Sequence, residues 1–402
     1  MIEMEYSKDK SNVNTKHKPD KGYRFEMKVD SRSQNTSLVV DQVKLSDIQD
    51  EWEKYVEKHP ASHFFNHPLW VKALESEFNH EPVVFVCRDT HSRIKGILPL
   101  MPTLGVPFKK KELISGRRLS SLPRTPLGGF LFDDKTAQQL LVEAAIKKVS
   151  EQKNLCLQLK SYSSEINENI EDLNRVNWRS SFYLKLPDCP SKIRFGDKKH
   201  HHKIKWAVNK ATNLGITVRE IESEKDLIKW YVLYLETVRY HMVPARPYRF
   251  FKFLYEKVMP KGLMKVLLAE GKDGNEKKLI AGSVFFFLND TVFYSFNGRN
   301  QTGLINHAND LIQWEAIHKA CEKGFKYYDM GEVSEGNASL AQFKAKWGCE
   351  AKQIYHYYCS SENIPISENL ECEGNGNFIR SIWRKLPLKV TQEIGIFTNR
   401  FL

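Results

Sequence analysis

The sequence lacks the features that mark membrane-spanning and secreted proteins. No stretch approaches the ~18 consecutive apolar residues that a membrane-spanning helix needs, and the apolar run 284–288 is only as long as a strand. The N-terminus has no apolar segment of the signal-peptide kind, because Glu3, Glu5, Lys8 and Lys10 interrupt it at once. We therefore expect a cytoplasmic protein, and peripheral contact with the inner membrane face stays open.

The cysteine pattern lacks the spacings that bind zinc or form a disulfide framework. The seven cysteines are scattered and include no C-x-x-C pair, which fits reduced thiols. Three consecutive histidines, at 200–202, lie in a basic run that we expect to be helical. Neighbouring residues on a helix point in different directions. These side chains therefore cannot all face one ion, and we predict no metal site.

The chain also lacks the signatures of enzymes that form a covalent intermediate. It contains no G-x-S-x-G turn and no catalytic-cysteine motif. Direct transfer of a group between two bound substrates needs no covalent enzyme nucleophile and stays possible.

The composition indicates two folded domains and an anionic partner. A chain of 402 residues with 41% hydrophobic and 12% aromatic residues can form two cores. Residues 1–36 are rich in Lys, Ser, Asn and Asp without apolar periodicity, so we expect a disordered leader. The formal net charge of +12 favours RNA, a CoA or carrier phosphate, or a membrane surface. A merely solvated basic surface explains the charge equally well.

The order of the apolar patterns indicates a duplicated unit. Residues 94–98 and 280–284 each follow a strand and a charged turn, and each leads to a Gly-bearing loop and a long helix. Antiparallel strands followed by a strand–helix–strand crossover imply a mixed sheet with helices on both faces. We expect an α/β (α+β) fold with two tandem domains, 37–190 and 191–362, and a basic amphipathic tail, 363–402.

Four segments between residues 60 and 360 carry a family resemblance. They are FFNHPLWVKALESEFNHEPVVFVCRDTHSRIKGILPLMP, TVRYHMVPARPYRFFKFL, HANDLIQWEAIHKACEKG with the following FKYYDMG, and LAQFKAKWG. With these segments, residues 60–360 resemble the FemAB family of GNAT-like tandem acyltransferases associated with cell-surface assembly. One departure is Glu332, which follows the segment 329–331 that is similar to the family's Asp-aromatic-Gly element; relatives often have Arg at this place. The donor bound here can therefore differ from theirs.

The resemblance implies transfer of an aminoacyl or acyl group to an amine. The donor would be an aminoacyl-tRNA or an acyl-CoA, with no tightly bound cofactor. The amine acceptor would be a cell-wall or surface-polymer precursor, which is lipid-linked in some cases. Acetyl-CoA-dependent N-acetylation is the alternative within enzymes. The alternative outside enzymes is a non-catalytic RNA- or membrane-binding protein, in which the basic run 198–205 or the tail would be the binding surface.

Two residues are the predicted catalytic pair. Leu340, Phe343 and Trp347 lie at helical spacing and should bury one face of a short helix, which would hold Lys344 beside that face. A fixed cation there can stabilise a tetrahedral intermediate or a donor phosphate; the alternative is a solvated surface lysine. Asp329 ends a strand where α/β sheets bind ligands. It would orient the amine or act as base, or form a structural hydrogen bond.

Other side chains are predicted to bind substrate. Arg299 lies in a Gly-bearing loop before a helix, where a pyrophosphate can bind, although the usual motif is only half present. A flexible loop that covers the substrate explains this segment equally well. Arg239 ends a helix, and a cation there also fits simple dipole complementarity. Asn309, next to Asp310, falls in a first helical turn, where capping is the alternative to substrate contact. The predicted substrate-binding set is Arg239, Tyr294, Arg299, Asn309, Trp314, Phe343 and Trp347.

Overall fold

The computed structural model describes most of the chain. The described residues are 24–27, 37–104, 117–166, 168, 170–273, 276–334, 336–360 and 383–401. The predicted disordered leader, residues 1–36, lies outside them except for β1 (Arg24–Met27), which is a strand and not part of a structureless segment. Part of the predicted tail, residues 363–382, also lies outside the described residues.

The first half contains a curved sheet with helices on both sides. Its elements are β2 (Leu38–Val43), α1 (Leu45–Lys58), η1 (Phe64–Asn66), α2 (Pro68–Phe78), β3 (Val83–Arg88), β4 (Ile94–Thr103), β5 (Arg117–Ser120), β6 (Leu131–Phe132), α3 (Lys135–Ser150), β7 (Leu155–Ser161), β8 (Asn174–Lys185) and η2 (Pro190–Lys192). Helix α3 begins where the Asp134 carboxylate accepts a hydrogen bond from the Ala137 amide. Such an N-cap contributes ~1 kcal/mol to helix stability.

The second half repeats the scheme with longer strands. Its elements are α4 (Lys198–Asn213), β9 (Thr217–Glu220), α5 (Glu224–His241), α6 (Tyr248–Lys257), η3 (Met259–Lys261), β10 (Met264–Asp273), β11 (Glu276–Leu288), β12 (Thr291–Arg299), α7 (Gln301–Ile305), α8 (Ala308–Glu322), β13 (Tyr327–Val333), α9 (Ala338–Lys346), β14 (Glu350–Ser360), α11 (Leu388–Thr398) and η4 (Asn399–Phe401). Helix α5 is capped by the Ser223 hydroxyl, which accepts from the Asp226 amide.

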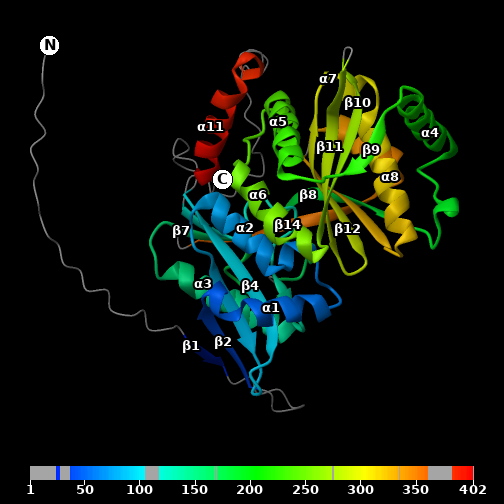
Figure 1. Cartoon of the computed structure of the whole chain (residues 1–402). Helices are drawn as coiled ribbons and strands as arrows, with labels where there is room; N and C mark the ends of the chain where they lie inside the picture. Colours follow the sequence, from blue (N-terminus) through cyan, green and yellow to red (C-terminus); the bar gives the residue numbers. More distant parts are fainter. Residues whose placement is uncertain are drawn as a thin grey trace, which may run out of the picture.

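One continuous sheet joins the two halves. The strand order is β1-β2-β3-β4-β5-β7-β14-β8-β13-β12-β11-β10-β9, and β6 pairs with β4. Strands β5 and β7 are parallel, as are β12 and β13, which makes the sheet mixed as expected. In Figure 1 the earlier elements form the lower part of the molecule and the later ones the upper part. The predicted boundary at residue 190 stays a prediction, because β8 precedes it yet lies between β13 and β14.

Strand β8 was not expected from the sequence. Its residues are exposed or half-buried without regular alternation, and only Ser181 and Leu184 of the strand are buried. A strand of this kind has little of the apolar alternation that sequence patterns detect. Its position is fixed by pairing with both β13 and β14, so it holds the later half of the sheet together.

The core consists of several apolar clusters on the two faces of the sheet. The largest contains the fully buried Trp52, Trp70 and Trp230 and joins residues of both halves, and a second lies beneath α4 and α8. Fully burying one large apolar side chain contributes ~1.5–3 kcal/mol. Cys156 and Cys321 are buried.

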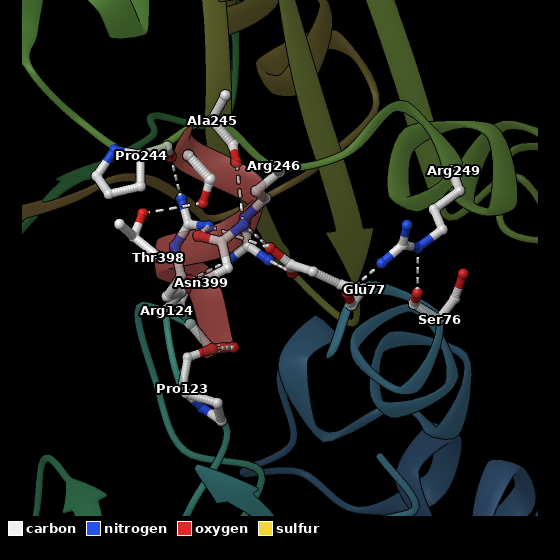
Figure 2. Close-up of polar contacts among 12 residues, drawn as sticks. Ser76, Glu77, Pro123, Arg124, Pro244, Ala245, Arg246, Arg249, Thr398 and Asn399 are labelled. Atoms are coloured by element: carbon white, nitrogen blue, oxygen red, sulfur yellow. Dashed lines mark hydrogen bonds and ion pairs between the residues drawn. The ribbon is translucent and has the colours of Figure 1, made fainter. Parts of the chain in front are cut away.

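A buried polar cluster fastens the first half to the second. Figure 2 shows the side chains of Arg124, Arg246 and Asn399 directed at the carboxylate of Glu77. Glu77 pairs with the Arg246 guanidinium and, at 3.1 Å, with that of Arg124, and its side chain is 0% exposed. Arg124 also donates to the carbonyl of Pro244 at 2.6 Å. Because removal of one partner leaves a buried charge unpaired, this polar cluster stabilises the contact between the two halves.

Helix α11 lies against α5, as Figure 1 shows. The Gln392 amide donates to the Tyr231 hydroxyl at 3.2 Å, and Asn399 donates to the carbonyl of Ala245 at 2.9 Å. Phe397 stays exposed. The described part of the tail therefore packs on the protein, and its binding to a membrane stays a prediction. Among the described helices, none has the length and apolar character to cross a bilayer.

Candidate functional site

The parallel pairing of β12 with β13 ends abruptly in the second half of the sheet. Only Thr291, Val292 and Phe293 of β12 pair with β13, and the last partner is Asp329. Beyond this point β12 stays with β11, whereas β13 continues along β8 after an irregularity in register. Where β12 and β13 separate, the backbone groups on their facing edges no longer pair with each other. Ligands of α/β sheets commonly bind at such points.

Gly331 brings three groups together at this point. Its φ of +79° is a left-handed conformation that suits glycine. A Cβ at this residue would lie 3.8 Å from the carbonyl oxygen of Tyr294 and 4.0 Å from Nζ of Lys344. The turn at Gly331 therefore places a strand end, a neighbouring strand and a lysine side chain within contact distance of one another.

Lys344 is the buried side chain of helix α9. Only 4% of the residue is exposed. Its ammonium donates to the carbonyl of Gly331 at 2.8 Å and to that of Glu332 at 3.1 Å. Burial lowers the pKa of Lys344 to about 8, against the opposing effect of Asp329. Because an ammonium has three donors, one is left without an acceptor among the described residues and can bind a ligand.

Asp329 lies on β13, two residues before Gly331, and its carboxylate interacts electrostatically with Lys344 of α9. Its carboxylate accepts hydrogen bonds from the Ser181 hydroxyl at 3.2 Å and the Gly331 amide at 2.5 Å. Burial raises the pKa of Asp329, and these hydrogen bonds, together with Lys344 and the Tyr162 hydroxyl, oppose the rise. A buried carboxyl and a buried amine thus both have shifted pKa values, and such shifts cluster at functional sites.

Asp329 and Lys344, the predicted catalytic pair, are therefore adjacent. Helix α9, which carries Lys344, is oriented differently from the prediction. Leu340 is exposed and not buried, so the expected apolar face of α9 is wrong at that position. Trp347 is fully buried, and Phe343 packs against the same cluster. Lys344, expected beside the apolar face, is itself turned into the protein. The backbone carbonyls of Gly331 and Glu332 explain this, because their hydrogen bonds with the buried ammonium offset the cost of removing it from water.

Arg239 and Arg299 line one cavity of about 190 Å³ between the end of α5 and the start of α7. Arg239 donates to the carbonyl of Leu386 at 2.8 Å. Arg384 lies over the Tyr240 ring, 4.0 Å from its centroid. The guanidinium of Arg299 has no hydrogen bond or ion pair with the described residues, and burial lowers its pKa. Both predicted arginines can thus face one anionic ligand, which stays untested.

One amide of the loop after Arg299 is already bonded within the protein. Asn300 caps α7, since its side chain accepts from the Gly303 amide at 2.8 Å. Gly303 also packs directly against the carbonyl of Ile280. The helix has only five residues. Binding of a pyrophosphate at this loop stays a prediction, and the Gly303 amide is not free for it.

The other predicted residues make contacts within the protein. Tyr294 packs on Phe285, and burial raises the pKa of Tyr294 to about 12. Asn309 does not cap α8, whose N-cap is His307; it reaches Asn297 at 3.5 Å. Trp314 packs on Phe195, on the α4 side of the sheet. Substrate contact by Tyr294, Asn309, Trp314, Phe343 and Trp347 stays a prediction.

Sequence reasoning missed Ser181 and Tyr162, which bond Asp329. Both hydroxyls come from strands of the first half, β8 and the end of β7, so no spacing near Asp329 points to them. A metal site was not expected. Glu53, Glu57 and His67 lie within ligand distance of one another, but Lys261 already pairs with Glu53.

The comparisons with known proteins bear on the fold of the chain. Residues 198–344 match the acetyltransferase (GNAT) domain, a segment that ends at Lys344. The solved structure of FemX superimposes with a TM-score of 0.59 at 13% identity, covering 77% of this chain and 95% of that one. The chain has a FemAB-like GNAT fold.

Two further solved structures show a similar likeness. L-PGS from Bacillus licheniformis matches with a TM-score of 0.50 at 9% identity, over 79% of this chain and 93% of that chain. The C-terminal domain of a putative lysylphosphatidylglycerol synthetase from Agrobacterium fabrum gives 0.52 at 9%, over 78% and 92%. At these identities the likeness concerns the fold alone. No curated protein matches the sequence.

Proposed function

We propose that this FemAB-like protein is an amine acyltransferase with Lys344 and Asp329 as its catalytic residues. The observation that carries the proposal is the buried ammonium of Lys344, held by two carbonyls beside a buried carboxylate at the end of the β12–β13 ladder. The GNAT match over residues 198–344 and the FemX-like fold support the same reaction class.

The geometry suggests how the transfer would proceed. The amine nitrogen attacks the acyl carbonyl carbon, and the remaining N–H of Lys344 stabilises the oxyanion, an effect of ~2.7–4 kcal/mol per donor. Asp329 accepts the proton that the amine loses when the C–N bond forms. The bond to the leaving oxygen or sulfur then breaks, and that atom takes a proton. Positioning two substrates here contributes a further ~7–11 kcal/mol.

An aminoacyl-tRNA is the donor we propose, with acetyl-CoA as the alternative. The amide of Gly303, which a CoA pyrophosphate would use, is already bonded to Asn300. The net charge of +12 and the basic helix α4, with Trp206 60% exposed, suit a nucleic acid. The proposed acceptor is an amine on a cell-wall or surface-polymer precursor, a choice that rests on the likeness to FemX.

A transfer assay tests the reaction class. Purified protein is incubated with labelled aminoacyl-tRNA or acetyl-CoA and a panel of amines, in parallel with Lys344→Met and Lys346→Met. Lys346 is the control, because it lies on the same helix but pairs with Asp310 at 2.9 Å. We expect a loss of about 10²–10³ in rate for Lys344→Met only.

The non-catalytic alternative predicts the opposite pattern. Neutralising the lysines of residues 198–205 would abolish function, whereas Lys344→Met would change nothing. Absence of turnover with both donors, in a protein that is folded by melting temperature, would refute the enzyme proposal.

A further inference from the structure

A second cavity lies on the strands where the two halves share the sheet. It measures about 320 Å³ and is bordered by β5, β7, β14, β8 and β13. Small-molecule sites begin at ~300 Å³, whereas one water occupies ~30 Å³. The cavity wall carries the charged residues Arg118, Arg124, Lys160, Arg179 and Glu332. It is large enough for an organic ligand and rich in positive charge.

Two buried N–H donors in this cavity lack partners among the residues that the structure describes. They are Nε1 of Trp178 and Nε2 of His356, whose rings stack 4.2 Å apart. Only 3% of His356 is exposed, and burial lowers its pKa well below the ordinary value, so the ring is neutral. An unmade hydrogen bond of a buried donor costs ~1–3 kcal/mol, which a ligand acceptor would relieve.

The hydrogen-bond network fixes the tautomer of His356. The Gln158 side-chain oxygen accepts from Ser120 at 2.5 Å, so its amide nitrogen is the donating end. That nitrogen lies 3.3 Å from Nδ1 of His356, and the Tyr358 hydroxyl lies 3.0 Å from the same atom. Nδ1 is therefore the acceptor, and the proton is on Nε2. The ring thus offers a donor to the cavity, next to that of Trp178.

The charges beside these donors favour an anion with a neighbouring hydroxyl or amine. Lys160 donates to the carbonyl of Thr125 at 2.6 Å, which leaves its charge without a carboxylate partner at that contact. Arg179 pairs with one oxygen of Glu332 at 3.4 Å. The other oxygen of Glu332 is buried without a hydrogen-bond partner among the described residues. It would accept from a hydroxyl or an ammonium group.

We infer that this cavity binds a phosphate ester that also carries an amine or hydroxyl group. The phosphate contacts Lys160, Trp178 and His356, and the amine or hydroxyl contacts Glu332. Phosphate recognition by lysine and neutral N–H donors is common, and a single carboxylate among several cations accounts for the second group.

The cavity adjoins the proposed catalytic centre. The backbone carbonyl of Glu332 accepts from Lys344, and Tyr162, two residues after Lys160, bonds Asp329. If the proposed acyl transfer is correct, the phosphate ester is the acceptor, since its amine would lie near Asp329. This assignment rests on the proposed function, whereas binding of the ligand does not.

Calorimetry with three probes tests the site: inorganic phosphate, phosphoethanolamine and ethanolamine. Trp178→Phe keeps the stacked ring and removes only the donor, and it should weaken phosphate binding about tenfold. Lys160→Met should weaken it ~10–100-fold. Arg175→Met is the control, because Arg175 lies over Tyr355 outside the cavity. Its binding should equal that of the unaltered protein, and melting temperatures confirm that each variant is folded.

Glu332→Gln separates the two parts of the ligand. We expect phosphoethanolamine to bind more tightly than phosphate, and Glu332→Gln to abolish that difference. Ethanolamine alone should bind weakly or not at all. Phosphatidylethanolamine vesicles, tested in parallel, show whether a lipid headgroup or a soluble ester is accepted.

Failure of this inference can be distinguished from failure of the proposed function. If phosphate does not bind at about 10 mM, or if Trp178→Phe and Lys160→Met bind like the control, the site is refuted. The transfer assay with Lys344→Met would stand unaffected by that result. Conversely, normal phosphate binding without acyl transfer would retain the site and remove its role in catalysis.

Discussion

Loss of the charge of Lys344 should change how the stability of the protein depends on pH. Burial lowers the pKa of this lysine from the ordinary 10.5 to about 8. Between these values the unfolded chain binds a proton that the folded chain does not. The free energy of unfolding therefore rises with pH in this window, because the unfolded state holds more protons. Below pH ~8 the full cost of burying the charge is present.

The size of the effect follows from the same shift. One pH unit corresponds to ~1.4 kcal/mol, so the window from 8 to 10.5 corresponds to about 3 kcal/mol. Lys344→Met cannot titrate and lacks this gain. Relative to the variant, the unaltered protein should become more stable by about 3 kcal/mol across the window, although the variant loses the bonds to Gly331 and Glu332 at every pH.

Urea unfolding of both proteins at several pH values measures this difference. Other groups titrate in the same window, but they are shared and cancel when the two curves are subtracted. Lys346→Met, which removes a lysine of the same helix that pairs with Asp310, is the matched control. A flat or falling difference for Lys344→Met would refute the claim that Lys344 is a buried, destabilised cation.

Three further predictions concern the frame of the site. Glu77→Gln should lower the free energy of unfolding by ~3–5 kcal/mol, whereas Glu75→Gln, on the half-exposed side of the same helix, should change it little in urea titrations. Gly331→Ala and Gly262→Ala both place alanine at positive φ, +79° and +75°, and should each cost ~1–2 kcal/mol; only the first should reduce the rate of acyl transfer. Gly395→Val should release α11, because a side chain there would meet the backbone of Ala245, and proteolysis near the C-terminus would report the release.

The central elements of the second half could be predicted because the apolar pattern of their own residues indicates a strand or a helix. The strand ending in Asp329 and the helix carrying Lys344 follow from apolar periodicity and the FemAB resemblance. The fold and the proximity of this pair are present in the structure. Their catalytic roles stay predictions.

The rest of the site could not be predicted because distant segments supply it. Strand β8 brings Ser181 and Trp178 to the second half, yet its side chains are too polar for an apolar pattern to reveal it. The burial of Lys344 itself depends on two backbone carbonyls presented by the turn at Gly331. Sequence patterns treat lysine as a surface residue. They therefore cannot predict a lysine that is buried because two backbone carbonyls accept its hydrogen bonds.

The buried polar cluster around Glu77 and the cavity that contains Lys160 depend on the same loop. Leu122 and Arg124 both have positive φ, +60° and +55°, which is unfavourable for residues with a side chain. Arg124 is held in this conformation by Glu77 and by the carbonyl of Pro244, one from each half. The loop also lines the cavity that contains Lys160. The two halves must therefore be docked for this wall of the cavity to exist, which makes the proposed phosphate site a property of the whole chain and not of the GNAT domain alone.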